Sequence, residues 1–515
     1  MQPSMTTGGV LAQAATRWPD RIAVSDRQRQ VTFEQLHDRA RKLAKAFVAS
    51  DYAAGQRVAI WAPNALEWME VALGAEMAGL VVVPLNTRYK GREAGDILRR
   101  SGAKMLFATR KFLGLDLAGM VADESLPDMD AIISIDPGSA ELSDFAAKGE
   151  GVSDADLDAR IDAVGPDDIA DILFTSGTTG LPKGVLCTHR QNIQSFTAWA
   201  DAVGLKAGDH YMIVNPFFHS FGYKAGWLAC LITGATAFPV PVFDSKVILE
   251  QIAADAITVL PGPPTLYQSL LDDPGLANHD ISTLRLAVTG AASVPPSLIG
   301  RMRDELGIDD VMTAYGLTEA TGVVTATHPD DPAELIAVSC GVPIPGVEIR
   351  LVDPDGNDVQ TGEAGELLVR GFNVMRGYLD DPEATAEAID ADGWLKTGDV
   401  AMQDEKGYLR ITDRVKDMII TGGFNVYPAE VEAILIDHPD VSRAAVVPMP
   451  DERMGEVGRA WLVMREGATL DEAAMTAWAR ENMANFKVPR SFRAIDELPM
   501  NASGKVQRFA LKDAD

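Results

Sequence analysis

Cysteine is scarce in this sequence of 515 residues, which contains only Cys187, Cys230 and Cys340. These positions are too far apart to form a CxxC pair, so the sequence predicts neither a disulfide framework nor a zinc site. Few cysteines without a pairing pattern are typical of a reducing compartment. We therefore expect a cytoplasmic protein.

Positive charge is also in short supply. Lysine and arginine number 46 against 74 aspartate and glutamate residues, which gives a formal net charge of −28 and a sequence pI of about 4.6. Such a field repels the phosphate backbone of nucleic acids and the surface of anionic membranes. We therefore expect no nucleic-acid partner.

Long apolar runs are missing as well. No run approaches the roughly 20 residues that span a bilayer, and the first residues, MQPSMTTGGVLAQAATRWPDRIAV, contain no basic segment leading into an apolar one. We expect neither a secretory signal nor an integral membrane segment. The chain has no internal repeat, and its length exceeds the usual limit of a single hydrophobic core, so two or more domains are expected.

Strand and helix patterns alternate along much of the chain. A strand at 57–62, a helix at 65–78 and a strand at 80–84 predict a βαβ unit, and therefore parallel strands. Further strands are predicted at 104–109, 131–135, 211–214, 235–240, 258–260 and 284–288, and helices at 32–50, 246–254, 265–271 and 296–306. The acidic, weakly patterned segment 137–168 is interpreted as a surface crossing. The pattern predicts a doubly wound α/β fold.

The pattern of predicted strands and helices changes in the last third of the chain. Residues 341–410 read as short strands separated by Gly, Asn and Asp, which predicts a small β subdomain. Pro428 marks a helix start, and further strands and an amphipathic helix at 471–483 follow it. We expect a compact α+β unit at this end.

The stretch 171–186, DILFTSGTTGLPKGVL, has the pattern of an anion-binding loop. An apolar strand, Ile172-Leu173-Phe174, stops at a loop rich in hydroxyl groups and glycines, and Lys183 follows at once. Glycines let the backbone approach an anion closely, hydroxyl and N–H groups donate to phosphate oxygens, and a lysine adds positive charge. The predicted polyphosphate cradle consists of Thr175, Ser176, Gly177, Thr178, Thr179, Gly180 and Lys183.

This loop is not a Walker motif, because only Thr178 and Thr179 separate its first two glycines. It resembles the phosphate loop TSGTTGxPKG of the adenylate-forming superfamily. That superfamily includes acyl-CoA synthetases, luciferases and nonribosomal adenylation domains.

Motifs further along the chain match the same superfamily in order. In FFHSFGYKAG, His219 would on its own more often be a packed core residue, and the resemblance implies that it lies at the acyl pocket. Amino-acid-activating relatives have an aspartate in this neighbourhood, which is absent here, so an amino-acid substrate is not expected. The resemblance assigns Gly290, Ala291 and Ala292 to the adenine site.

The run TAYGLTE carries the next set of implied roles. Ala314, Tyr315 and Gly316 would lie near adenine, the Thr318 hydroxyl would reach a phosphate, and Glu319 would bind Mg²⁺, a cation that prefers oxygen ligands. A YG dipeptide alone would be an ordinary turn. The complete run, together with the phosphate loop, favours membership of the adenylate-forming superfamily.

The C-terminal motifs imply a movable domain. Asp399 in WLKTGD would accept both ribose hydroxyls, Arg414 would contact ribose or phosphate, and Lys416 matches the superfamily's hinge. Gly422 and Gly423 would form part of a tunnel for the pantetheine arm, where a β-carbon would obstruct it. Lys505, in the pattern NxxGKxxR, would enter the site during adenylation and neutralise charge in the transition state.

The resemblance covers essentially the whole chain and implies an ATP-dependent carboxylate:CoA ligase. Its expected domains are 1–414, with the ATP and acyl sites, and a mobile 415–515. Catalysis would involve Lys505, Thr318, Glu319 and His219, with ATP, Mg²⁺ and coenzyme A as partners of a small carboxylic acid. Since the negative field would also repel ATP and CoA, local cations or Mg²⁺ are required. The oligomeric state stays open, with a homodimer among the alternatives.

Other functions remain as alternatives. An acyl-AMP ligase that loads a carrier protein, a luciferase-like oxygenase and a non-catalytic nucleotide-binding protein share the fold. The sequence ends soon after Lys505, which leaves no room for a fused carrier.

The acyl group is the least defined feature. Lys224, in HSFGYKAG, is an unusual cation for an acyl pocket, and either contacts an oxygenated substrate or extends to the surface. This run is similar to ligases that activate propanoate side chains on partly degraded steroid rings. We therefore expect a bulky alicyclic keto acid, with a medium-chain or long-chain fatty acid as the alternative.

Overall fold

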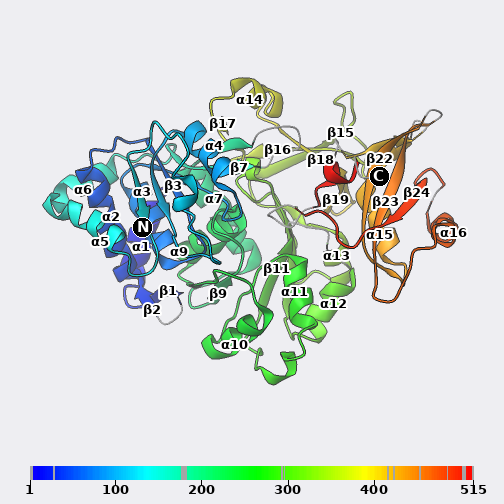
Figure 1. Ribbon diagram of the computed structural model, residues 1–515, viewed down its shortest axis with the longest axis horizontal. Helices are drawn as coiled ribbons and strands as arrows, with labels where there is room; N and C mark the ends of the chain where they lie inside the picture. The colour runs from blue at the N-terminus through cyan, green and yellow to red at the C-terminus, as the bar shows by residue number, and fades with distance from the viewer. Residues whose placement is uncertain are drawn as a thin grey trace. The chain divides into compact units, whose positions relative to one another are not determined.

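The computed structural model describes residues 4–26, 29–175, 182–290, 294, 296–414, 417–421, 424–451, 454–483, 485–500 and 506–512. The chain, coloured by residue number in Figure 1, divides into two compact units. The first unit contains Met1–Glu348 and Val369–Leu395, and the second contains Ile349–Leu368 and Lys396–Asp515. In the described part of the chain no helix is long and apolar enough to cross a membrane.

A mixed seven-stranded sheet forms one core of the first unit, in the order β17-β8-β7-β4-β3-β5-β6. Its strands are β3 (Arg57–Trp61), β4 (Val81–Pro84), β5 (Ala103–Ala108), β6 (Ala131–Ser134), β7 (Ile169–Thr175), β8 (Lys183–Thr188) and β17 (Gly377–Tyr378). Strands β3 and β4 are parallel and are joined by α3 (Leu66–Met77), so the predicted βαβ unit is confirmed. Strands β7, β8 and β17 instead pair in antiparallel fashion at one edge.

Helix α2 (Phe33–Ala49) begins as the sequence predicts. The Thr32 side chain accepts from the Gln35 N–H, and the Gln35 side chain accepts from the Thr32 N–H, which is a complete capping box. Helix α3 is buried on every side, because α2 covers one face and the sheet the other. A Cβ added at Gly74 of α3 would lie 2.7 Å from the Leu43 Cβ of α2, so this glycine permits the close approach.

A second set of strands in the first unit is joined by single bridges. The order β2-β1-β10-β9 continues through bridges at Val259 to β11-β12-β13-β14. Its strands are β1 (Ile22–Asp26), β2 (Arg29–Thr32), β9 (His210–Ile213), β10 (Thr236–Pro239), β11 (Leu286–Gly290), β12 (Asp310–Tyr315), β13 (Thr325–Ala326) and β14 (Val342–Pro343). The strand predicted at 258–260 is only an isolated bridge, because within this segment Val259 alone pairs with Tyr211 and Leu286.

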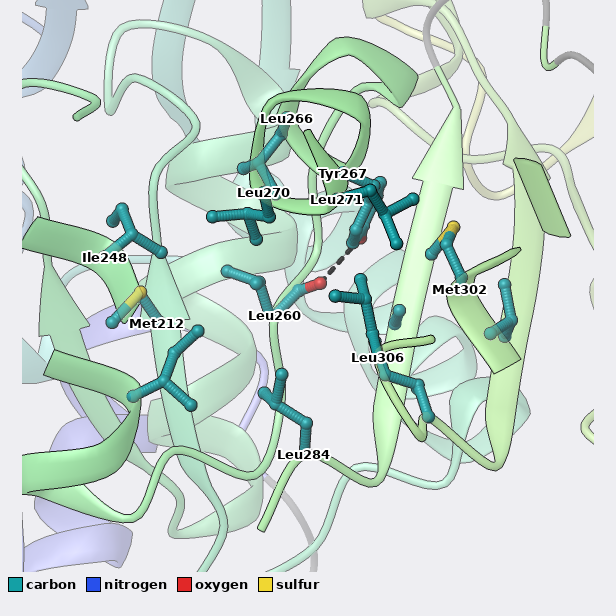
Figure 2. Packing of buried hydrophobic residues seen from close by; sticks show 14 of the residues in the cluster. Met212, Ile248, Leu260, Leu266, Tyr267, Leu270, Leu271, Leu284, Met302 and Leu306 are labelled. Carbon is teal, nitrogen blue, oxygen red and sulfur yellow. Dashed lines mark hydrogen bonds between the residues drawn. The ribbon is translucent and has the colours of Figure 1, made fainter. Parts of the chain in front are cut away.

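Side chains from α10 (Ser245–Asp255), α11 (Pro264–Leu271) and α12 (Pro296–Asp304) pack beside these strands in one buried cluster. Figure 2 shows Leu260 among the side chains of α11, with the Tyr267 hydroxyl donating to the Leu260 carbonyl at 2.6 Å. This bond satisfies the one polar group of a fully buried tyrosine, as burial requires.

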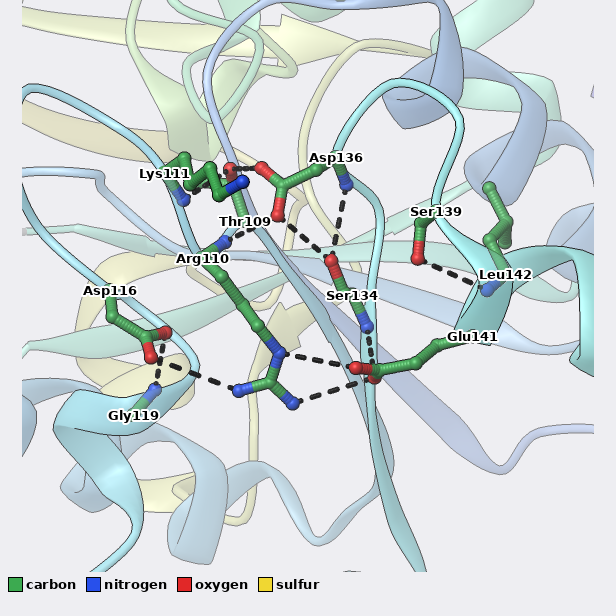
Figure 3. Close-up of polar contacts among 10 residues, drawn as sticks. All are labelled: Thr109, Arg110, Lys111, Asp116, Gly119, Ser134, Asp136, Ser139, Glu141 and Leu142. Carbon is green, nitrogen blue, oxygen red and sulfur yellow. Dashed lines mark hydrogen bonds and ion pairs between the residues drawn. The ribbon is translucent and has the colours of Figure 1, made fainter.

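The acidic segment 137–168 contains two helices that its weak pattern did not predict. They are α5 (Ala140–Ala147) and α6 (Asp154–Asp162), and the Ser139 and Ser153 side chains cap their first turns. Capping serines, rather than a periodic apolar face, mark these helices. Just before them, Asp136 accepts from the Arg110 N–H and the Ser134 hydroxyl and fixes the turn after β6 (Figure 3).

The remaining helices of the first unit complete its layers. They are α1 (Thr7–Arg17), α4 (Gly91–Ser101), α7 (His189–Val203), α8 (Ser220–Gly222), the π-helix η3 (Tyr223–Leu228), α9 (Ala229–Thr233), α13 (Ala333–Val338) and α14 (Pro382–Ala388), with short 3₁₀ turns η1 (Gly119–Val121), η2 (Lys148–Gly151), η4 (Leu276–Asn278) and η5 (Thr318–Ala320).

The second unit holds most of a four-stranded sheet and a five-stranded one. The first has the order β15-β16-β18-β19, and in the second β24 pairs with β23 of the path β21-β20-β23-β22. The elements are β15 (Val347–Val352), β16 (Gly365–Gly371), β18 (Leu395–Gln403), β19 (Leu409–Arg414), β20 (Ile419–Thr421), β21 (Phe424–Val426), α15 (Pro428–Ile436), β22 (Val441–Asp451), β23 (Gly455–Met464), α16 (Glu472–Asn482), β24 (Ser491–Ala494) and α17 (Arg508–Lys512). The predicted small β region and α+β unit are confirmed.

Candidate functional site

The predicted phosphate loop connects two antiparallel strands. Strand β7 ends at Thr175 and β8 begins at Lys183, and these two residues are paired across the hairpin. The Thr175 hydroxyl also donates to the Lys183 carbonyl at 3.4 Å. The two ends of the predicted polyphosphate cradle therefore lie side by side.

Several predicted site residues lie outside the described part of the chain. They are Ser176, Gly177, Thr178, Thr179 and Gly180 of the loop, Ala291 and Ala292 of the adenine motif, and Lys416, Gly422, Gly423 and Lys505 of the C-terminal motifs. Their roles remain predictions.

A tyrosine that the sequence analysis missed lies between two predicted phosphate-site residues. The Lys183 Nζ is 4.9 Å from the centre of the Tyr378 ring, and the Tyr378 hydroxyl donates to the Glu319 Oε1 at 3.1 Å. All three side chains are half-buried. Burial and the negative charge of Glu319 raise the pKa of Tyr378, so its hydroxyl remains a hydrogen-bond donor.

Glu319 fits a magnesium ion that arrives with a nucleotide. Among the described residues, no group of three or more His, Cys, Asp or Glu side chains is placed to hold a metal. Magnesium is usually held by one or two carboxylates together with phosphate oxygens and waters, rather than by an all-protein cage. A single half-buried carboxylate beside the end of the phosphate loop matches that pattern.

The predicted adenine residues gather at the ends of two parallel strands. In the pairing of β11 with β12, Gly290 lies opposite Ala314. A Cβ added at Gly290 would lie 2.7 Å from the Ala314 oxygen, and one at Gly316 only 2.1 Å from the Gly322 oxygen. Both glycines are therefore required by close backbone contacts.

The turn that carries Thr318 and Glu319 is fixed by its neighbours. It forms η5, which begins three residues after Tyr315, the last residue of β12. The Thr321 hydroxyl donates to the Asn373 carbonyl at 2.6 Å, and the Met375 N–H donates to the Glu319 carbonyl at 2.9 Å. The backbone on which the Glu319 carboxylate sits is held from both sides.

His219 is not a packed core residue. It is half-exposed, and its Nδ1 accepts from the Phe221 N–H at 3.1 Å at the start of α8. The buried Asn64 side chain fixes the preceding turn, since its Oδ1 accepts from the Phe217 N–H at 2.8 Å and its Nδ2 donates to the carbonyls of Ile213 and Asn215. The histidine thus stands on a rigid turn.

Lys224 does not extend to the surface. It lies in the π-helix η3, and its Nζ is 3.0 Å from the Asp171 Oδ1 of β7, with both side chains fully buried. Burial favours the neutral amine, but the charge of Asp171 outweighs it and raises the pKa of Lys224. The buried cation therefore keeps its charge, with a carboxylate as its direct partner.

Two more carboxyl-binding groups complete this buried cluster. The Asn192 Nδ2 donates to the other Asp171 oxygen at 2.6 Å, and the Tyr223 hydroxyl donates to Glu76. Burial raises the pKa of Glu76 to about 8, so this carboxyl is protonated at neutral pH. Asp171 was not singled out in the sequence, although it is a carboxylate in an otherwise apolar strand. A buried charge of this kind requires a cation nearby, which is the signal that could have identified it.

The second unit contains two more of the predicted nucleotide residues. Asp399 in β18 and Arg414 at the end of β19 are paired across the antiparallel strands. Asp399 is buried, and its N–H donates to the Thr397 hydroxyl at 3.1 Å. The predicted ribose and phosphate contacts therefore start from neighbouring strands of one sheet.

Comparison with known proteins identifies the family. A family model described as AMP-binding enzyme matches residues 11–379, and one described as AMP-binding enzyme C-terminal domain matches residues 430–505. The chain is similar to two proteins named 3-[(3aS,4S,7aS)-7a-methyl-1,5-dioxo-octahydro-1H-inden-4-yl]propanoyl:CoA ligase. The one from Mycobacterium tuberculosis (strain ATCC 25618 / H37Rv) is 50% identical over 99% of this chain and 98% of its own. The one from Rhodococcus jostii (strain RHA1) is 48% identical over 99% of both chains.

Solved structures agree with these relatives. The anthranilate CoA ligase AuaEII in complex with anthranoyl-AMP matches with a TM-score of 0.88 at 27% identity, over 99% of this chain and 97% of that one. The o-succinylbenzoate CoA synthetase MenE from Bacillus subtilis, in complex with the acyl-adenylate intermediate OSB-AMP, matches with a TM-score of 0.83 at 30% identity, over 98% of both chains. The expected fold, the ATP-dependent reaction through an acyl-adenylate and the use of CoA are confirmed. The chain therefore belongs to the AMP-binding enzyme family, as an acyl-CoA synthetase of the AMP-forming type.

Proposed function

We propose that the acid activated by this enzyme is a bulky alicyclic keto acid with a propanoate side chain, of the kind left by partial degradation of steroid rings. The observation that carries the proposal is the identity of 50% and 48%, over nearly the whole length, with two ligases named for a dioxo-indanyl propanoyl group. A medium-chain acyl-CoA ligase of Homo sapiens is more distant, at 33% identity.

Adenylation is the step that the first unit serves in this proposal. The phosphate loop from Thr175 to Lys183 binds the β- and γ-phosphates, Gly290 and Tyr315 border the adenine, and Thr318 donates to a phosphate oxygen. Glu319 would hold Mg²⁺, which offsets negative charge on the phosphates when bound. The substrate carboxylate, beside His219, attacks the α-phosphate and releases pyrophosphate.

Thioester formation follows in the same proposal. Domains 1–414 and 415–515 rotate about Lys416, which withdraws Lys505 and brings Gly422 and Gly423 to line the pantetheine arm. The CoA thiolate then attacks the acyl carbon and AMP departs. Asp399 and Arg414 keep the nucleotide bound through both steps.

The free cysteines are in keeping with a cytoplasmic location.

Lys505→Ala tests the division of labour between the half-reactions. Removing a cation from the adenylation transition state is expected to lower pyrophosphate exchange by about 100-fold or more. Thioester formation from supplied acyl-AMP should remain largely intact, since that step does not use Lys505. Equal loss of both half-reactions would contradict domain alternation.

A substrate panel tests the acyl group. The rate of acyl-CoA formation is measured with the dioxo-indanyl propanoic acid, its analogue without ketones, octanoate, palmitate and benzoate. The keto acid is expected to have the highest kcat/KM. A higher value for octanoate or palmitate would overturn the proposal in favour of a fatty-acid ligase, and acyl-AMP without thioester would point to an acyl-AMP ligase.

A further inference from the structure

The segment from Met375 to Leu379 joins the two phosphate-site elements of the first unit. The Met375 N–H donates to the Glu319 carbonyl at 2.9 Å, on the turn η5. At the other end of the segment, the Leu379 N–H donates to the Gly184 carbonyl of β8 at 2.8 Å. One short strand, β17, is therefore tied to Glu319 at one end and to the residue after Lys183 at the other.

The Tyr378 side chain repeats this connection. Its hydroxyl donates to the Glu319 carboxylate at 3.1 Å, and the Lys183 ammonium lies 4.9 Å from its ring centre. The ring face carries partial negative charge and attracts a cation, while the hydroxyl stabilises an anion. A single tyrosine thus contacts a positive group and a negative group through different parts of its side chain.

This arrangement keeps the positive Lys183 and the negative Glu319 from pairing with each other. A lysine and a carboxylate that bind the same polyphosphate must lie close together, and in a partly desolvated site they would attract each other. Among the described residues no ion pair joins Lys183 directly to Glu319, and each of the two contacts Tyr378. Tyr378 occupies the position between them and gives each one a weaker, exchangeable partner.

We propose that Tyr378 is a positioning residue for adenylation, which orients Glu319 through its hydroxyl and holds Lys183 over its ring, so that neither group pairs with the other before nucleotide binds. The inference rests on the proposed roles of Lys183 and Glu319. Tyr378 acts through those two residues and takes no part in the bond changes.

Tyr378→Phe removes the hydroxyl and retains the ring. Binding of Mn²⁺ is measured from the electron paramagnetic resonance signal of the free ion, in the presence of α,β-methylene-ATP, which cannot be cleaved at the bond the enzyme breaks. The Mn²⁺ dissociation constant is expected to rise by about 10-fold, because a carboxylate that loses a hydrogen bond is no longer held in one orientation. Tyr52→Phe is the matched control, since the Tyr52 hydroxyl donates to Asp130 at 3.2 Å far from this site in the sequence.

Two further variants separate orientation from general damage. In a Glu319→Ala background, Tyr378→Phe should have no additional effect on Mn²⁺ binding, because its target is already gone. Tyr378→Leu, which also removes the ring, should weaken binding of α,β-methylene-ATP without metal, whereas Tyr378→Phe should not. Thioester formation from supplied acyl-AMP should be unchanged in both Tyr378 variants.

Unaltered Mn²⁺ binding by Tyr378→Phe would overturn the inference. So would an equal loss of thioester formation, which would indicate a merely structural role. The variants Lys183→Met and Glu319→Ala, each made in the parent enzyme with Tyr378 intact, check the proposed function separately. Unchanged Mn²⁺ and nucleotide binding in these variants would remove the roles on which the inference rests.

Discussion

Two lysines of the first unit meet carboxylates in opposite ways. Lys224 and Asp171 form a direct ion pair at 3.0 Å in the fully buried interior. Lys183 and Glu319 are half-buried and each contacts Tyr378 instead. Both groups include a residue of the hairpin β7-β8, yet one is closed to solvent and the other is half-buried.

The difference follows from what each charge must do. A charge in the interior has lost its water and requires a permanent partner of opposite sign. A charge that binds a phosphate or a metal has to exchange partners, so a strong direct pair would compete with the ligand. We infer that the Lys224 group supports the strand that leads into the predicted phosphate loop, whereas the Lys183 group has the proposed role of binding the nucleotide phosphates and Mg²⁺.

The largest expected effect is on folding. Asp171→Ala should lower the free energy of unfolding by about 3–5 kcal/mol, because Lys224 would remain as a buried charge without a partner. Urea unfolding followed by tryptophan fluorescence measures it, since Trp68 and Trp227 pack against Tyr223 in this cluster.

Two controls complete that comparison. The double variant Asp171→Leu with Lys224→Met removes both charges and should cost less than either single change. Glu319→Ala, at the half-exposed group, should change stability by less than about 1 kcal/mol. An Asp171→Ala protein as stable as the parent would show that the two groups do not differ in this way.

A smaller effect is expected in the pH dependence of stability. The pKa of Glu76 rises from 4.5 to about 8 on folding, so between these values the folded protein holds a proton that the unfolded chain releases. Stability should therefore fall as pH rises through this range, by up to about 1.4 kcal/mol per pH unit. The buried His189, whose pKa is lowered to about 4, has the opposite slope, but only below pH 6.5.

The window from pH 6.5 to 8 isolates Glu76 from His189. Thermal unfolding midpoints of the parent and of Glu76→Gln are compared across this window. The glutamine is neutral at every pH and nearly the same shape, so it should flatten the slope. An unchanged slope would mean that Glu76 is ionised in the folded protein.

The smallest effect is expected at the surface. Arg110 pairs with Glu141 at 3.2 Å, but both side chains are well exposed (Figure 3). Since water screens such a pair, Arg110→Ala should cost no more than about 1 kcal/mol in the same urea experiment. A loss as large as that of Asp171→Ala would remove burial as the reason for the contrast.

Much of the fold could be predicted from local patterns. The capping box at Thr32, the apolar run of β7 and the βαβ unit depend on residues close together in sequence, and each is present. The helices α5 and α6 were missed because their apolar faces are short. The strand predicted at 258–260 is absent because pairing within that segment is limited to isolated bridges at Val259.

The sequence by itself determined the order of the motifs, and with it the family, because a loop of glycines, hydroxyls and a lysine has its chemistry in its own residues. Only the tertiary structure decided which charges meet. Asp171 and Lys224 belong to segments that local pattern does not connect, and Tyr378 reaches Lys183 and Glu319 only because β17 adds to the edge of the sheet at β8. Contacts that are set by strand pairing and burial depend on the whole fold, so local sequence patterns do not identify residues such as Tyr378 or the partner of Asp171.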